Sequence, residues 1–258
     1  MTENEINNTC IFINSSDKTH DVAKYFLKSY EKYIKNSFLK VFIGVNKKKH
    51  NTYKFLNYIL APESNWQTET IYQLNKLKNQ YGYKYVIHIL DDFIFYDYSN
   101  INDLKSILEH VQLNNIKYLC LIRLRESLLI NLIHNIISKK LINKVRENYP
   151  YYSSLQMSIW NIDYLIKNIE KCNSIWNFER QQMSKNHFHL RKDFFYYKHI
   201  VEKGEWNYGS SKYVKKYIGH FDSGNRPFRK SFLGREIFYL KKISFLIFGF
   251  LIMKIKGN

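Results

Sequence analysis

A six-residue apolar run that ends in two adjacent carboxylates constrains this chain more than any other feature of its sequence. The run, Tyr85–Leu90, has the length and the β-branched content of a buried strand, and Asp91 and Asp92 follow it directly. In an open α/β sheet, ligands bind just beyond the carboxyl ends of the strands. Two acids there can hold a divalent cation, and the cation can hold a diphosphate. The same acids can also simply open a turn, so both interpretations stay open.

Strands and helices are expected to alternate through the first half of the chain. Because the crossovers between the strands are long enough to hold a helix, a parallel sheet is expected. This is the layout of the first half of a nucleotide-binding α/β domain. The predicted strands are Cys10–Asn14, Leu39–Val45, Tyr85–Leu90 and Lys117–Leu124, and the predicted helices begin near Asp21, Thr68 and Asn102.

The second half is less regular. Ser127–Val145 is apolar with interspersed lysines, and its periodicity does not distinguish a helix from a hairpin. Asn161 or Asp163 is expected to start a helix, and Ser174–Glu179 is expected to be a loop. No internal repeat and no Gly/Ser-rich linker forces a domain boundary.

The net charge of the chain indicates which classes of molecule it can bind. Its 258 residues include 40 Lys and Arg against 22 Asp and Glu, a formal net charge of +18. Such a surface attracts nucleic acid, anionic lipid or phosphorylated substrates. The basic residues are scattered and form no nucleic-acid-recognition motif, so we expect no nucleic-acid partner. Three widely spaced cysteines indicate ordinary thiols in a reducing compartment, and the polar Met1–Thr9 segment has no secretory pattern, so a cytoplasmic protein is expected.

Five short motifs follow one another in a recognisable order. They are Ser16-Asp17-Lys18, Leu90-Asp91-Asp92-Phe93, Ser154-Leu155-Gln156 with Ile159-Trp160, Trp176-Asn177-Phe178-Glu179, and Val201–Trp206 with Lys203 and Gly204. Their order and spacing resemble a group of bacterial GT-A-type glycosyltransferases of capsule and lipopolysaccharide biosynthesis. The resemblance covers roughly Ile11–Tyr217. In that group an acidic motif follows a core strand, a Ser-Leu-Gln segment introduces a helix, and a Trp-x-Phe-Glu loop comes after it.

The resemblance implies a fold, an activity and a division of the chain. The expected fold is a GT-A, Rossmann-like α/β fold with a mixed central sheet flanked by helices. Residues 1–228 would form the catalytic domain, with a donor half at about 10–125 and an acceptor half at about 150–220. The implied reaction moves a sugar from a nucleotide-diphosphate donor, such as a UDP-sugar, to a hydroxyl group of a surface glycan or a lipid-linked acceptor.

The donor side of the implied site contains the acid pair. Asp92 is expected to bind Mn²⁺ or Mg²⁺, and Asp91 the ribose or sugar hydroxyls. The usual GT-A motif is Asp-x-Asp, whereas the two acids are adjacent in this chain, so the reverse assignment stays open. Ser16 and Asp17 would contact the nucleotide base or ribose, or would cap a helix instead. Lys203 could reach the diphosphate.

Glu179 is the candidate base that removes the proton of the acceptor hydroxyl. Burial beside Trp176 and Phe178 would raise the pKa of its carboxyl group toward a useful value. A base on the face opposite the leaving group implies direct displacement, and hence inversion at the anomeric carbon. The alternative is a surface carboxylate paired with Arg180 or Lys185.

Three residues are candidates for binding the acceptor. Gln156, Trp160 and Trp176 could shape its site, because sugars stack on aromatic faces through their C–H groups. Core packing explains Trp160 equally well.

Two classes of protein other than a glycosyltransferase are also compatible with parts of the sequence. A nucleotidyltransferase or phosphotransferase could use the same acid pair, but the sequence has no Gly-rich phosphate loop to support that interpretation. A basic nucleic-acid-binding protein would leave the two acids unexplained.

Residues 229–258 differ from the rest of the chain. The uncharged run Ile243–Met253 has cationic residues on both sides and is too short to span a bilayer, which needs about 20 residues. An interfacial helix on an anionic membrane surface fits this pattern, and a helix packed on protein is the alternative. Membrane attachment would place the protein at the inner face of the cytoplasmic membrane.

Overall fold

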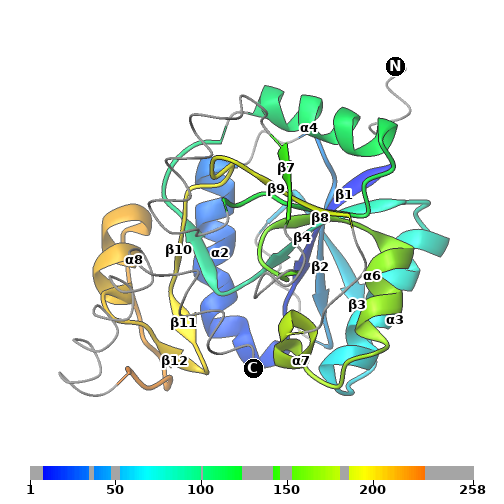
Figure 1. Ribbon diagram of the computed structural model, residues 1–258. Coiled ribbons are helices and arrows are strands. Elements are labelled where there is room, and N and C mark those ends of the chain that lie inside the picture. The colour runs from blue at the N-terminus through cyan, green and yellow to red at the C-terminus, as the bar shows by residue number, and fades with distance from the viewer. Residues whose placement is uncertain are drawn as a thin grey trace.

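The computed structural model describes residues 8–34, 38–47, 53–99, 101–123, 142–145, 153–180 and 186–229. One mixed eight-stranded sheet forms its centre, and helices lie on either side of it (Figure 1). This confirms the expected mixed α/β class. The strands of the sheet are β1 (Thr9–Asn14), β2 (Val41–Val45), β3 (Leu56–Leu60), β4 (Tyr85–Leu90), β6 (Tyr118–Cys120), β7 (Ile142–Lys144), β8 (Ser158–Asn161) and β9 (His187–Leu190).

The order of the strands places β4 in the middle of the sheet. That order is β3-β2-β1-β4-β8-β6-β9-β7, and the first four strands are parallel. Strand β8 is antiparallel to both of its neighbours, β4 and β6. Strand β9 is parallel to β6, and β7 is antiparallel to β9. Strand β4, which the two acids follow, therefore has a hydrogen-bonded neighbour on each side.

Strand β4 has the bounds that its apolar run predicts. Tyr85–Ile89 are all buried, and the register with β1 runs from Thr9 opposite Tyr85 to Asn14 opposite Leu90. A parallel strand covered on both faces reads as a nearly continuous apolar run, which is why the sequence locates it so well. Both β1 and β4 end at the same edge, just before the residues of the candidate site.

The helices begin at identifiable caps. Asn65 caps α3 by accepting the backbone N–H of Thr68 at 2.9 Å, so the prediction that Thr68 is the cap was wrong. Asn161, one of two predicted starts, caps α6 by accepting the N–H of Tyr164 at 3.1 Å. Helix α4 begins at Ile101, so Asn102 lies inside it. The helices are α2 (His20–Tyr33), α3 (Trp66–Asn79), α4 (Ile101–Leu113), α6 (Ile162–Ile169), α7 (Ile175–Arg180) and α8 (Ser210–Ile218), with a 3-10 turn η1 at Asp17–Thr19.

Several short elements differ from the predictions. The expected loop at Ser174–Glu179 is largely helix α7, whose first turn is capped by the hydroxyl of Ser174. Strand β3 was not predicted, because only two of its five residues are buried. The expected strand at Lys117–Leu124 is shorter, at Tyr118–Cys120. Most of Ser127–Val145 lies outside the described residues, and its described end forms β7.

A second layer packs against helix α2 and carries one wall of the site. It contains β5 (Phe93–Phe95) paired with β10 (Tyr197–His199), and the hairpin of β11 (Val201–Glu202) with β12 (Glu205–Trp206). The buried ring of Trp206 lies at the centre of a small apolar cluster between this layer and α2. In Figure 1 the hairpin and α8 lie on the far side of α2 from α3 and α6.

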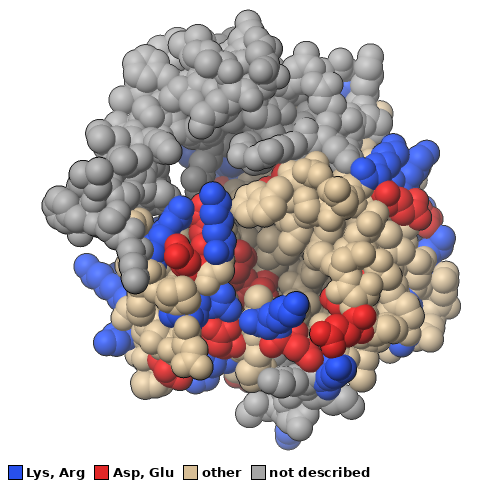
Figure 2. Space-filling view, turned by 90° about the horizontal axis from the view of Figure 1, so that it is seen from below, with Lys and Arg blue, Asp and Glu red and all other residues tan. Residues whose placement is uncertain are grey.

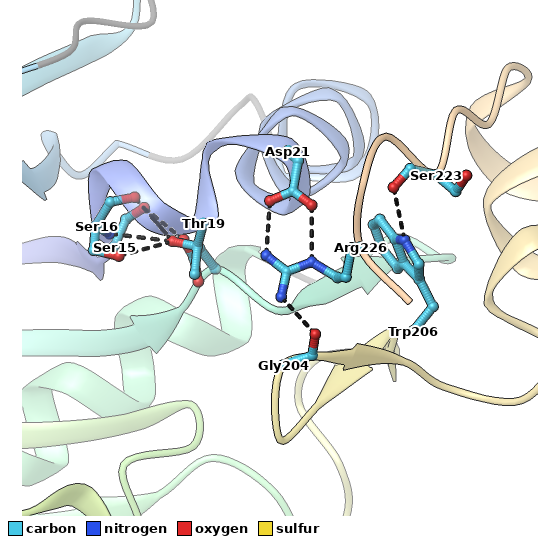
Figure 3. Close-up of polar contacts among 9 residues, drawn as sticks. Ser15, Ser16, Thr19, Asp21, Gly204, Trp206, Ser223 and Arg226 are labelled. Atoms are coloured by element: carbon cyan, nitrogen blue, oxygen red, sulfur yellow. Dashed lines mark hydrogen bonds and ion pairs between the residues drawn. The ribbon is translucent and has the colours of Figure 1, made fainter. Parts of the chain in front are cut away.

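Residues 219–229 return to α2 and fasten the second layer to it. Arg226 donates from Nε and Nη2 to the two carboxylate oxygens of Asp21, at 2.8 and 2.7 Å, and from Nη1 to the carbonyl of Gly204 at 3.0 Å (Figure 3). The same guanidinium lies 5.8 Å from the ring centroid of Trp206, whose indole N–H donates to the carbonyl of Ser223. The hairpin is therefore held to α2 by charge as well as by packing.

Within the described ranges, no helix is both long and apolar enough to cross a membrane. The predicted membrane-associating segment lies outside the described residues, apart from Arg229 at its start.

Candidate functional site

Acidic side chains gather where the parallel strands end. Figure 2 views the molecule from the side on which α7 lies, and Asp and Glu side chains occupy the middle of that face with Lys and Arg around them. Carboxyl ends of parallel strands are the usual ligand-binding edge of an α/β sheet. The acid pair after β4 lies at this edge, as its sequence position predicts.

Asp91 is buried and held by two hydroxyl groups. Its Oδ2 atom accepts hydrogen bonds from Ser15 Oγ and Thr19 Oγ1, both at 2.5 Å, and its side chain is only 6% exposed. Burial raises the pKa of Asp91 to about 7, against the two hydroxyl bonds, which lower it, and the charge of Asp92 raises it further. Both hydroxyl donors come from the segment that follows β1, so this segment is fixed to the end of β4.

Asp92 points to a different partner. Its Oδ2 atom lies 2.6 Å from Nε2 of His199, at the end of β10. The backbone reinforces this contact, because the N–H of Ile200 donates to the carbonyl of Asp92 at 3.0 Å. Burial lowers the pKa of His199, but the hydrogen bond to Asp92 and the charge of that carboxylate raise it, and the net result lies above the ordinary value. The contact with Asp92 therefore favours the protonated form of His199.

Glu179 completes the acidic group from α7. Ser154 Oγ donates to Glu179 Oε1 at 3.1 Å, and the carboxylate also accepts the backbone N–H of Leu155. Burial raises the pKa of Glu179, while these two donors lower it. The charge of Asp92 raises it and that of His199 lowers it, so the three groups act on one another in a shared site. The alternative surface partners of Glu179, Lys185 and the side chain of Arg180, lie outside the described residues.

His199 was missed by sequence reasoning. It lies in a short aromatic strand with no motif around it. Its position depends on the antiparallel pairing of β10 with β5, which places His199 opposite Phe93, next to Asp92. The one available signal was a histidine in a predicted apolar segment between Phe194 and Val201.

Ser16 and Asp17 lie beside the site and already have structural partners. The carboxylate of Asp17 accepts the backbone N–H groups of Asn46 and Lys47 at 3.2 and 3.0 Å, which fixes the loop after β2. The N–H of Ser16 donates to Thr19 Oγ1 at 3.2 Å, at the start of η1. The two residues therefore shape the end of β1, and a contact with a nucleotide remains a prediction.

The acceptor candidates lie in different environments. Trp160 is fully buried, with its ring 4.3 Å from that of Tyr118 and its indole N–H bonded to Ser158, so it is a core residue. Trp176 is 53% exposed and lies one turn before Glu179 on α7.

The two other predicted contacts, Gln156 and Lys203, also differ in position. Gln156 is half-buried, and its Oε1 atom is 3.5 Å from the hydroxyl of Tyr197. Lys203 is exposed at the tip of the β11–β12 hairpin, with a backbone φ of 53°.

Oδ1 of Asp92 is the atom that could hold a cation. Oδ1 of Asp92 is buried and has no hydrogen-bond partner among the described residues. No cluster of three or more His, Cys, Asp or Glu side chains within those residues is arranged to hold a metal. Mg²⁺ commonly takes only one or two protein carboxylates and completes its shell with phosphate and water. Asp92 would be one protein ligand of such a cation, and a phosphorylated substrate and water would supply the others.

Comparison with known proteins gives structural similarities at low sequence identity. No protein-family model and no curated protein matches the sequence. The crystal structure of S. aureus TarS is similar with a TM-score of 0.45 and 14% identity, over 81% of this chain and 38% of that one. Its fragment 1–349 in complex with UDP gives a TM-score of 0.45 and 15% identity, over 81% and 64%. A cytidylyltransferase from Leptospira borgpetersenii gives 0.45 and 11%, over 93% and 96%.

This chain spans less than two thirds of the length of either of these TarS chains. At such scores and identities, the function has to be inferred from the residues of this chain itself.

Proposed function

We propose that this chain is a glycosyltransferase that moves a sugar from a nucleotide-diphosphate donor to a hydroxyl group of a glycan or a lipid-linked acceptor. The observation that carries the proposal is the convergence of Asp91, Asp92, Glu179 and His199 at the carboxyl edge of the sheet. The alternative, in which Asp91 and Asp92 only open a turn, would not require Glu179 and His199 beside them. Buried carboxylates with raised pKa values, such as those of Asp91 and Glu179, beside a histidine are typical of sites that bind charged substrates and transfer protons.

The acid pair suits the donor half of the reaction. Breaking the glycosidic bond leaves negative charge on a diphosphate, and a bound Mn²⁺ or Mg²⁺ would neutralise this charge as a Lewis acid. Asp92 is the proposed protein ligand, because its Oδ1 atom is buried and unpaired among the described residues. Asp91, whose Oδ2 already accepts two hydroxyl groups, is proposed to bind the ribose or sugar hydroxyls instead.

Glu179 suits the acceptor half. Its raised pKa brings the carboxylate closer to the range in which it can accept a proton from an attacking hydroxyl group. His199, when protonated, would balance part of the negative charge of the site. Direct attack assisted by one base implies inversion at the anomeric carbon. The exposed ring of Trp176 and the amide of Gln156 are the proposed acceptor contacts, whereas Trp160 supports them from the core.

Attachment to a membrane surface belongs to the same proposal. Residues 229–258 would hold the enzyme at the inner face of the cytoplasmic membrane, where a lipid-linked acceptor is available. Deleting Leu240–Asn258 should move the protein from the membrane fraction to the supernatant. The idea fails if the full-length protein is already found in the supernatant without detergent or lipid.

A ligand panel followed by product analysis tests the proposed activity. Thermal stability is measured with a set of nucleotide sugars, with Mn²⁺ or with EDTA, and the stabilising donor is then incubated with candidate glycan acceptors. Glycosyl transfer releases a nucleoside diphosphate. Release of pyrophosphate from a nucleoside triphosphate would instead show the alternative, a nucleotidyltransferase. Failure of every nucleotide sugar to stabilise the protein or to be turned over would exclude the proposed function.

A further inference from the structure

A polar residue interrupts the apolar strand β4 in the middle of the sheet. His88 in β4 is fully buried, and its neighbours along the strand are apolar. Burial lowers the pKa of His88 to about 4, against the hydrogen bond to the carbonyl of Leu155, which raises it. The imidazole is therefore neutral at neutral pH. Such a break of the local pattern in an otherwise apolar strand calls for a functional explanation.

The hydrogen bonds of His88 fix which ring nitrogen carries the proton. Nδ1 lies 3.0 Å from the carbonyl oxygen of Leu155, and because a carbonyl only accepts, Nδ1 must carry the hydrogen. Nε2 is then an acceptor, and it receives the side-chain N–H of Asn14 at 3.4 Å. The second hydrogen of the same amide donates to Thr70 Oγ1 at 3.1 Å. Asn14, at the end of β1, thus holds His88 in one tautomer and one orientation.

The peptide group that His88 contacts leads directly to the candidate base. The carbonyl of Leu155 and the N–H of Gln156 belong to one peptide plane. That N–H donates to Ser154 Oγ at 3.1 Å, and Ser154 Oγ donates to Glu179 Oε1 at 3.1 Å. Every donor in this series points toward the carboxylate. Hydrogen bonds in a chain polarise one another in the same direction, which strengthens the last bond to an anion.

We propose that His88 is a positioning residue for Glu179, which it aligns through the series Asn14, His88, the Leu155–Gln156 peptide and Ser154. This series fixes the Ser154–Gln156 loop against β4. It also keeps the hydroxyl of Ser154 directed at the carboxylate, since the oxygen of that hydroxyl is already accepting the N–H of Gln156. Only the role of Glu179 as base rests on the proposed function; the alignment itself does not.

Other groups that act on Glu179 lie outside this series. The charge of Asp92 at the end of β4 raises the pKa of Glu179, and that of His199 on β10 lowers it. Tyr118 on β6 also faces Glu179, and its hydroxyl accepts the N–H of Ser154 at 3.1 Å. No substitution at His88 removes any of these groups, so a change in the titration of Glu179 reports on the series.

The test compares two substitutions of His88 that differ in one hydrogen bond. Leu in place of His88 fills a similar volume but has no donor for the carbonyl of Leu155. Asn places an amide N–H close to the position of Nδ1 and keeps that bond. His189→Leu is the matched control, because His189 is also buried but lies on β9, three strands away from β4.

The readout is the titration of Glu179 itself. A protonated carboxyl group has its own infrared band, and the band of Glu179 is identified by its loss in Glu179→Gln. We expect the midpoint of this band to rise by about 0.3 to 1 pH unit in His88→Leu, because the carboxylate loses stabilisation. The midpoint should stay near the wild-type value in His88→Asn and His189→Leu.

A second variant covers the case in which His88→Leu does not fold. Asn14→Ala removes the donor to Nε2 and should raise the midpoint in the same direction by a smaller amount. Equal midpoints in the wild type and in the folded variants would overturn the proposal. Because the band needs no substrate, this outcome is separate from a failure to find sugar transfer. If transfer is found, the acid limb of the pH–kcat profile should move with the infrared midpoint.

Discussion

Nε2 of His199 lies 2.6 Å from Oδ2 of Asp92, although 107 residues separate them in the sequence. The pairing of β10 with β5 makes this contact, and it leaves the other oxygen of Asp92 buried without a partner among the described residues. The carboxylate therefore has one oxygen bonded to His199 and one without a hydrogen bond to the described residues. Such an arrangement suits a group that must hold a ligand in a single orientation.

Replacing Asp92 with Asn should remove most of the activity while preserving the fold. The amide oxygen can still accept from His199, but the negative charge is lost. We expect kcat for sugar transfer to fall by about 100-fold or more, which is the usual cost of losing one electrostatic contact to reacting charge. Asp97→Asn, at an exposed position of the following turn, is the control and should behave as the wild type. Full turnover by Asp92→Asn with unchanged dependence on Mn²⁺ would contradict the assignment.

Glu179→Gln keeps the shape of the side chain and its bond to Ser154, but it cannot take a proton. A general base contributes about 10²- to 10⁴-fold, so kcat should fall by that factor with little change in donor binding. Steady-state kinetics together with a thermal-shift titration of the donor separates the two effects. Glu170→Gln, an exposed change at the end of α6, serves as the matched control. Near-normal kcat in Glu179→Gln would exclude its role as base.

His88 should make the protein less stable in acid. Its pKa is about 4 in the folded state and 6.5 when unperturbed, so below pH 6.5 the unfolded chain binds a proton that the folded chain does not. The contribution of His88 to the free energy of unfolding should then fall by about 3 kcal/mol as the pH decreases from 6.5 to 4. Asp91, whose pKa is raised to about 7, contributes in the opposite direction in both proteins, so the measurement is the difference between wild type and His88→Asn. Denaturant titrations at several pH values should show the variant gaining stability relative to the wild type as the pH falls. The exposed variant His110→Asn should keep the wild-type slope.

Arg226 should contribute more to the stability of the second layer than the exposed ion pair beside it. Its side chain is 12% exposed and makes two parallel bonds to Asp21, which Lys cannot reproduce. Arg226→Lys is expected to lower the free energy of unfolding by about 1–2 kcal/mol and to speed amide exchange in Val201–Trp206. Lys24→Met breaks the exposed pair with Asp222 and should have a clearly smaller effect, because solvent screens that pair. Equal effects of the two changes would contradict this ranking.

The sequence predicted the parts of the molecule whose chemistry is local. Strand β4 was located to the residue, because a strand buried on both faces must be apolar throughout. Asp91 and Asp92 could be located in the same way, because they directly follow this apolar run. Helix α7 was predicted as a loop, since six residues are too few to show helical periodicity.

The parts that depend on distant pairing could not be predicted. His199 reaches Asp92 only through the pairing of β5 with β10, and no local pattern encodes that register. The hydrogen bonds of His88 were hidden for a similar reason. They join β1, β4 and the segment before β8, three parts of the chain that meet only in the folded sheet.

The position of β8 between β4 and β6 has a consequence for how the chain reaches its native state. Residues 158–161 hydrogen-bond to strands on both sides, and both of those strands precede them in the sequence. During synthesis, the edges of β4 and β6 that pair with β8 therefore stay unpaired until residues 158–161 have been made. A fragment ending near residue 125 should therefore fail to fold alone. The proposed donor and acceptor halves would then fold as a single cooperative unit.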